Sequence, residues 1–176
     1  MPSSALISFY RRQSPDDRGR TLDQVRALSV PELERVHDYI QWLFPLPEPS
    51  GANPTAPTLT KEDIELFATD PALRDELVSS YAVMLGFYGF RLAHGTARIE
   101  RRPDASERIT DWLRPGNHNF LRLTRIMRSL TVLGLADHAQ SLLGQLEQLY
   151  SDYPEIIGDL TIRHWRGAVA LNGRDT

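Results

Sequence analysis

The sequence contains no cysteine, only one lysine and no long apolar run. The absence of cysteine excludes disulfides, thiolate catalysis, Cys-ligated zinc and iron–sulfur clusters. The longest apolar stretch, residues 81–90, is about half the ~20 residues needed to cross a bilayer, and two glycines interrupt it. No apolar h-region precedes a cleavage site near the N-terminus, so we expect a soluble, cytoplasmic protein.

The residues that are present suit one compact domain. The chain has 176 residues, of which 41% are hydrophobic. A chain of this size buries roughly 70% of its unfolded surface, which is enough for a sizeable core. We expect residues 1–20 to be an N-terminal arm or loop and residues 21–176 to be a single helical domain.

Apolar residues recur with a period near 3.6, which predicts an all-α fold of six or seven helices. A capping box at Ser29 and Glu32 opens a helix over residues 30–43. Asp70 and Pro71 open the longest helix, about 71–90, whose second half is apolar nearly all round. We expect it to be the central, buried element. Further helices are expected near 61–67, 104–113, 118–133, 136–150 and from 154 onward, which makes seven with these two. Residues 21–28 are an additional short candidate, and residues 96–102 are expected to be extended.

Five prolines between residues 45 and 59 predict an ordered, mostly extended surface loop. Charge is also unevenly distributed. Residues 30–80 carry a net charge of −7, from ten acids and three bases, and residues 91–128 carry +5, from nine arginines and four acids. Either the two blocks attract each other within one fold, or the basic block meets an acidic partner.

The first group of candidate site residues lies in the helix expected over 30–43. His37 is either a titrating or ligand-contacting group, or a buried imidazole hydrogen-bonded to a backbone carbonyl and to Gln41. Tyr39 and Trp42 are either half-buried core residues or the apolar floor of a groove.

The second group begins at Asn117. His118 and the backbone N–H groups at the helix start, with Arg114, make an anion site in one interpretation, and in the other Asn117 merely caps the helix. Arg122, Arg125 and Arg128 follow at intervals of three and form one oblique stripe. The stripe is either a solvated face paired with the acidic block or a binding site for phosphate or acidic peptide.

Sequence motifs for catalysis and metal binding are lacking. The five histidines show no zinc-binding spacing, and neither a Gly-x-Ser-x-Gly elbow nor a glycine-rich phosphate loop occurs. We therefore expect no metal and no cofactor, and an enzyme is disfavoured without being excluded.

Four segments resemble the conserved region of the opioid growth factor receptor family. They are residues 37–45 (HDYIQWLFP), 51–60 (GANPTAPTLT), 84–89 (MLGFYG) and 117–130 (NHNFLRLTRIMRSL). The resemblance runs from about residue 21 to 135. It implies peptide binding, because the founding animal member is regarded as a receptor for methionine-enkephalin that is associated with the nuclear envelope. A short, cysteine-free and arginine-biased form resembles a bacterial relative without the long C-terminal extension of the animal receptors.

The leading hypothesis is a non-enzymatic domain that holds a peptide or protein segment. The ligand would lie near Tyr39, Trp42 and the proline-rich loop, with Arg122 and Arg125 binding its carboxylates; His37, Gln41, Asn117 and His118 complete the candidate site. Two alternatives stay open. One is nucleic-acid or nucleotide binding through residues 91–128, and the other is an enzyme whose acid–base group is His37 or His118.

Overall fold

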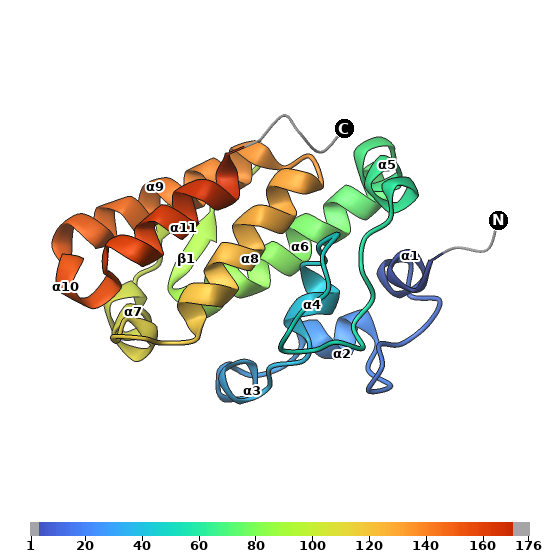
Figure 1. Ribbon diagram of the computed structural model, residues 1–176, viewed down its shortest axis with the longest axis horizontal. Helices are drawn as coiled ribbons and strands as arrows, with labels where there is room; N and C mark the ends of the chain where they lie inside the picture. Colours follow the sequence, from blue (N-terminus) through green and yellow to red (C-terminus); the bar gives the residue numbers. More distant parts are fainter. Residues whose placement is uncertain (1–3, 171–176) are drawn as a thin grey trace. The chain divides into compact units, whose positions relative to one another are not determined.

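The computed structural model describes residues 4–170, and the chain divides into two compact units, Met1–Val83 and Met84–Thr176. Within the described residues it has eleven helices and one two-stranded sheet (Figure 1). The helices are α1 (Ala5–Tyr10), α2 (Leu22–Arg26), α3 (Val30–Arg35), α4 (Ile40–Leu43), α5 (Lys61–Thr69), α6 (Pro71–Tyr88), α7 (Ala105–Trp112), α8 (Asn119–Val132), α9 (Ala136–Asp152), α10 (Pro154–Ile157) and α11 (Asp159–Val169). The strands are β1 (Phe90–Leu92) and β2 (Ile99–Arg101).

The mostly helical prediction is confirmed, but six or seven helices were too few and the small sheet was not expected. The predicted helix over 30–43 is divided into α3 and α4, because Val36 is extended, with ψ 132°. The predicted last helix is divided into α10 and α11 at Gly158, whose φ of 77° lies in the left-handed region. Each interruption turns one expected helix into two shorter ones.

The N-terminal segment differs from the expected arm or loop, because residues 5–10 form helix α1. Ser4 caps this helix by accepting a hydrogen bond from the Ile7 backbone N–H at 3.2 Å. Phe9 and Tyr10 are fully buried, and the Tyr10 ring meets Phe67 edge-on with centroids 5.0 Å apart. The segment is helical because folding gives its apolar side chains buried partners, which offset the cost of ordering a short helix.

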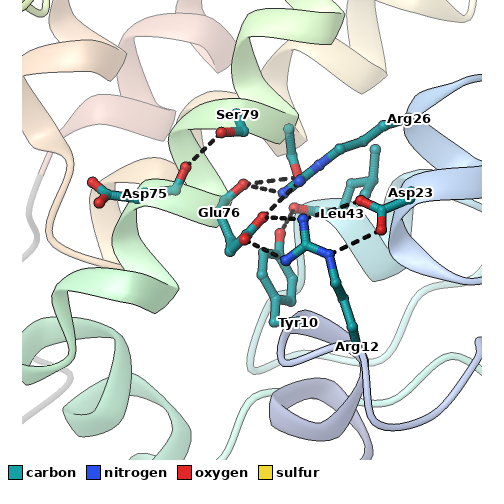
Figure 2. A network of polar contacts seen from close by, with 9 residues as sticks. Tyr10, Arg12, Asp23, Arg26, Leu43, Asp75, Glu76 and Ser79 are labelled. Carbon is teal, nitrogen blue, oxygen red and sulfur yellow. Dashed lines mark hydrogen bonds and ion pairs between the residues drawn. The ribbon is translucent and has the colours of Figure 1, made fainter.

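A network of ion pairs fastens α1 and α2 to α6 within the first unit. Figure 2 shows Arg12 and Arg26 converging on the carboxylate of Glu76. Arg12 also forms a bidentate pair with Asp23, at 2.9 and 3.0 Å. Arg26 further donates to Ser80 Oγ and to the Glu76 carbonyl. One carboxylate on α6 therefore holds two guanidiniums from two other segments.

The apolar stripe predicted for residues 71–90 is confirmed in α6. Every predicted face residue is buried: Leu73, Leu77, Tyr81, Met84, Leu85 and Tyr88. The helix ends at Tyr88, earlier than the predicted Phe90. Gly89 follows with φ 90°, a backbone conformation that favours glycine, and Phe90 then begins strand β1.

Helices α8, α9 and α11 pack side by side and form most of the second unit (Figure 1). A chain of edge-to-face ring contacts runs through its core from Tyr88 to Trp112, Phe120 and Trp165. The two buried indoles donate to backbone carbonyls, Trp112 to Tyr88 at 3.3 Å and Trp165 to Phe120 at 3.1 Å. The core is thus large and aromatic, with its polar N–H groups satisfied.

Strands β1 and β2 are antiparallel, with Arg91 opposite Glu100. The Ile99 N–H, on the outer edge of β2, donates to Ser141 Oγ of α9 at 3.1 Å. The expected extended stretch at 96–102 is confirmed in part, and its partner strand lies where a helix end was predicted. None of the helices among residues 4–170 has the length and apolar character needed to cross a membrane.

Candidate functional site

The first candidate group lies at the break between α3 and α4. His37 is exposed, so the buried-imidazole interpretation is wrong for this residue. It is not on a helix, because side-chain hydrogen bonds occupy the carbonyls that a continuous helix would use. Asn53 Nδ2 donates to the Asp38 carbonyl at 3.3 Å, and the Gln41 side chain bonds to the carbonyls of both His37 and Asp38. The chain around His37 is therefore not helical, and the Asp38 carbonyl binds Asn53 of the neighbouring loop.

Tyr39 and Trp42 belong to the packed core of the first unit. Tyr39 is fully buried and donates its hydroxyl to the Leu33 carbonyl at 3.0 Å. Trp42 is 4% exposed, and its ring lies against Phe9 with centroids 5.2 Å apart. Of the two interpretations offered for these aromatic residues, burial supports the core position. Both side chains are therefore part of the core and not of the exposed surface.

The indole of Trp42 reaches the proline-rich loop through Asp17. Its Nε1 donates to Asp17 Oδ1 at 3.0 Å, and the other carboxylate oxygen accepts from Thr55 Oγ1 at 3.1 Å. Asn53 Oδ1 lies 2.9 Å from the same hydroxyl, so Thr55 donates to one acceptor or the other. Asp17 thus joins the α4 helix to the far side of the loop.

Gln41 holds the near side of the loop. Its amide satisfies the most partners with Oε1 accepting from Ser50 Oγ at 3.2 Å and Nε2 donating to the His37 and Asp38 carbonyls at 3.3 Å each. The side chain is buried, so these bonds form away from bulk water. At the base of the loop, the Leu59 N–H donates to the Leu46 carbonyl at 3.0 Å.

Asp38 binds the segment before α2. Its carboxylate accepts from Arg18 Nε at 3.0 Å and from Arg20 Nη2 at 2.7 Å. Arg20 also donates to Asp16 Oδ2 at 2.8 Å, and the Asp16 side chain is fully buried. We name the set that fixes the proline-rich loop the loop clamp; it comprises Asp17, Asp38, Gln41, Trp42, Asn53 and Thr55.

The loop itself, residues 45–59, contains neither helix nor strand, as predicted. Its Leu46, Asn53, Ala56 and Leu59 are buried, and these residues alternate along it with exposed ones. The exposed residues are Pro47, Glu48, Pro49, Gly51, Ala52, Pro54 and Thr55. The clamp therefore presents a proline-dense surface whose backbone is held from below.

The second candidate group lies at the start of α8 in the second unit. Asn117 caps the helix, because its Oδ1 accepts from the Asn119 N–H at 2.8 Å. This bond supports the interpretation in which Asn117 caps the helix. His118 is half-buried at the N-cap position of α8, instead of pointing fully into water.

The expectation of a solvated arginine stripe is wrong for Arg122, because this residue is only 5% exposed. Its Nη1 lies 3.3 Å from Asn119 Oδ1, which also accepts from the Tyr88 hydroxyl at 3.2 Å. Arg125 and Arg128 are half-buried. The interval of three turns the stripe by about 60° per step, so its first member points inward.

Sequence reasoning identified Asp38, Gln41 and Trp42 as part of one segment but missed Asp17, Asn53 and Thr55 as their partners. The NPT sequence at 53–55 and the paired acids at 16–17 carry no signal of that pairing. Among residues 4–170 no group of three His, Asp or Glu side chains is placed to hold a metal ion.

Comparisons with known proteins place most of the chain in one family. The model of the opioid growth factor receptor (OGFr) conserved region matches residues 14–148. Over 110 residues, 62% of this chain, it is 46% identical to "Opioid growth factor receptor" of Rattus norvegicus, covering 18% of that protein. The human protein of the same name is also 46% identical over 110 residues, 16% of its length.

A second kind of relative is "Opioid growth factor receptor-like protein 1" of Xenopus tropicalis, 41% identical over 103 residues, which are 58% of this chain and 20% of that protein. The chain thus spans less than a quarter of each of these relatives. The relatives compared are vertebrate proteins, so the expectation of a bacterial-type member finds no support. No solved structure matches the chain.

Proposed function

The chain belongs to the family of the opioid growth factor receptor conserved region, and on this premise we propose that it is a non-enzymatic domain that binds a peptide or protein segment. The name of the rat and human relatives is that of a receptor, which is a protein that binds a ligand. A cytoplasmic location is part of the same proposal.

The observation that supports peptide binding is the clamped, proline-dense loop of the first unit. Pro47, Pro49 and Pro54 are exposed, while their backbone is held by the closed loop base and the loop clamp. Binding to a surface that is already ordered loses less conformational entropy than binding to a mobile loop. Proline rings also offer apolar contact area without side-chain rotamers to freeze.

The predicted site residues take two different parts in this proposal. His37 is exposed beside the clamp, and we propose that it contacts the ligand. Tyr39, Gln41 and Trp42 hold the surface in place from inside, since all three are buried. Asn117, His118 and Arg125 stay predictions as ligand contacts. Arg122 is kept only as an internal group bonded to Asn119.

The test is isothermal titration calorimetry of the full chain with methionine-enkephalin, followed by an array of short peptides. We expect heat of binding with at least one peptide. A triple variant, Pro47→Ala, Pro49→Ala and Pro54→Ala, is expected to lose about tenfold in affinity, or about 1.4 kcal/mol. The matched control is Pro71→Ala, an exposed proline of the same unit outside the loop, which should leave affinity unchanged.

A second variant separates order from contact. Asp17→Ala removes the acceptor shared by Trp42 and Thr55 while keeping all three exposed prolines. If loop order matters, this variant also weakens binding, although circular dichroism still shows a folded protein. The proposal would be contradicted if no peptide gave heat of binding, or if the wild type and both loop variants bound with the same affinity.

A further inference from the structure

The β1–β2 hairpin of the second unit carries an exposed basic surface, and the register of its strands decides which side chains share a face. Arg91 pairs with Glu100, and the Ala93 N–H donates to the Arg98 carbonyl at 2.8 Å. At the other end the Arg102 N–H donates to the Gly89 carbonyl at 3.0 Å. Opposite residues of an antiparallel pair point to the same side, and neighbours along a strand to opposite sides. Arg91, Arg98, Glu100 and Arg102 therefore lie on one face.

The other face of the hairpin is mostly apolar. Phe90 and Ile99 lie on it and are buried, at 0% and 4% exposure, whereas Arg101, opposite Phe90 at the end of β2, is exposed. The face that carries the arginines is consequently the outward face. The side chain of Arg91 is 60% exposed and that of Arg98 is 72% exposed.

Two carboxylates on this surface are each shared by two guanidiniums. Glu100 accepts from Arg91 Nη2 at 3.2 Å and from Arg98 Nη2 at 2.6 Å. Asp104 accepts from Arg102 Nε at 2.9 Å and from Arg108 Nε at 3.3 Å. Since one carboxylate neutralises one positive charge, half of the charge of these four arginines is left uncompensated. We name these residues the arginine face; it comprises Arg91, Arg98, Arg102, Arg108, Glu100 and Asp104.

Two glycines lie close to residues of the arginine face. A Cβ atom on Gly89 would lie 3.0 Å from Arg108 Cβ and 3.1 Å from Ala105 Cα, so α7 packs directly against the turn into β1. A Cβ on Gly86 of α6 would lie 3.5 Å from Arg102 Nη1, so this guanidinium lies over the helix end. The two glycines therefore leave room for Arg102, which follows β2, and for Arg108 of α7.

The other residues on the outward face of this hairpin are Gly89 and Ala93, which are small. The whole hairpin lies within the described residues. The face thus offers neither an aromatic ring for stacking nor an apolar pocket for an anchoring side chain. Recognition rests on guanidinium forks, which match the geometry of phosphate oxygens. This favours a phosphate backbone over an acidic peptide, whose binding normally includes apolar anchors.

We propose that the arginine face binds the phosphate backbone of a nucleic acid without reading its base sequence. This site is independent of the proposed peptide site, because it lies in the second unit and uses none of the loop residues. It also replaces the stripe at Arg122 and Arg125 as the place where the basic block of the sequence meets a polyanion.

The test is fluorescence anisotropy of labelled oligonucleotides of random sequence, single-stranded and duplex, titrated with the full chain. Each neutralised phosphate contributes about −0.7 to the slope of log K against log salt for a single strand. Two contacts, one for each uncompensated charge, give a slope of about −1.4, which weakens binding roughly sevenfold between 50 and 200 mM salt. The double variant Arg91→Ala/Arg98→Ala should bring the slope close to zero, because the remaining arginines and carboxylates of the face carry no net charge.

Glu100→Gln gives a prediction of the opposite sign. It removes the carboxylate that Arg91 and Arg98 share, so both are released for phosphate, and we expect binding to tighten about two- to five-fold. The control is Arg163→Ala/Arg166→Ala on α11, which removes the same charge from exposed residues elsewhere in the unit and should change affinity less than about twofold.

The result that supports the proposal is salt-dependent oligonucleotide binding that falls with the arginine variant and rises with Glu100→Gln. Three results would overturn it. They are absence of oligonucleotide binding, binding that Glu100→Gln leaves unchanged or weakens, and preference for poly-glutamate or for phosphatidylserine vesicles over oligonucleotides. If the double arginine variant fails to fold, Glu100→Gln alone decides between these results.

Discussion

Glu76→Gln is the sharpest test of what holds the first unit together. The glutamate on α6 receives Arg12 from the end of α1 and Arg26 from α2 (Figure 2). Glutamine has the same shape but no charge, so the substitution removes the attraction and leaves the packing in place. The Arg26 side chain is 12% exposed, so its charge has little water to replace the lost partner.

The size of the effect follows from this burial. Removing one partner of a fully buried pair costs about 3–5 kcal/mol, and exposed pairs are worth about 0.2–1 kcal/mol. Glu76 lies between these limits, because Ser80 and the Glu76 carbonyl still accept from Arg26 in the variant. We expect unfolding free energy to fall by about 1.5–3 kcal/mol. Asp23→Asn, which removes only an exposed partner of Arg12, should have a much smaller effect.

Urea unfolding followed by circular dichroism measures both variants, and pH supplies an independent check. Burial raises the pKa of Glu76, but hydrogen bonds from Arg12 and Arg26 outweigh it, so the pKa lies below its ordinary value of 4.5. A lowered folded-state pKa stabilises the protein above the unfolded value, and this is lost as the pH falls through the folded pKa. The difference between wild type and Glu76→Gln should therefore be full at pH 7 and shrink below pH 4.5. The reasoning would be refuted if Glu76→Gln were as stable as the wild type or no less stable than Asp23→Asn. It would also be refuted if the difference in unfolding free energy between wild type and Glu76→Gln grew on acidification.

Four further predictions concern single residues. Trp42→Phe removes the hydrogen bond to Asp17 and should lower the unfolding free energy by about 1–2 kcal/mol in urea titrations, with no effect if the indole is not part of the clamp. His37→Ala should leave thermal stability within about 0.5 kcal/mol of the wild type, because the side chain is exposed; unfolding of this variant would show that His37 packs inside. Gly89→Ala should destabilise by about 2 kcal/mol or more, because φ is 90° and the new methyl meets Arg108 and Ala105. Gly144→Ala, in α9 with open space around it, should instead stabilise by about 0.5–1 kcal/mol, and thermal unfolding of the pair compares them.

The candidate site shows how far residue patterns reach. The segment with His37, Gln41 and Trp42 and the loop after it were both recognised from the sequence, and they do lie together in the first unit. Their roles differed from the expected ones, because the helix that was to present them ends at Arg35. The carbonyls of His37 and Asp38 bond to the Gln41 side chain, and that of Asp38 also bonds to Asn53 from the loop. Such competition is invisible to helical periodicity.

The sequence by itself determined the long helices and their buried faces. A period of 3.6 residues and capping boxes such as Ser29–Glu32 and Thr60–Asp63 are local signals, and local signals fix where helices begin and which side is apolar. Only the tertiary structure decided the pairing of β1 with β2, the burial of Arg122 and the bonds of Asp17 to Trp42 and Thr55. Strands of three residues are too short to show alternation, and whether a charged side chain faces water or a partner depends on which distant segment folds against it.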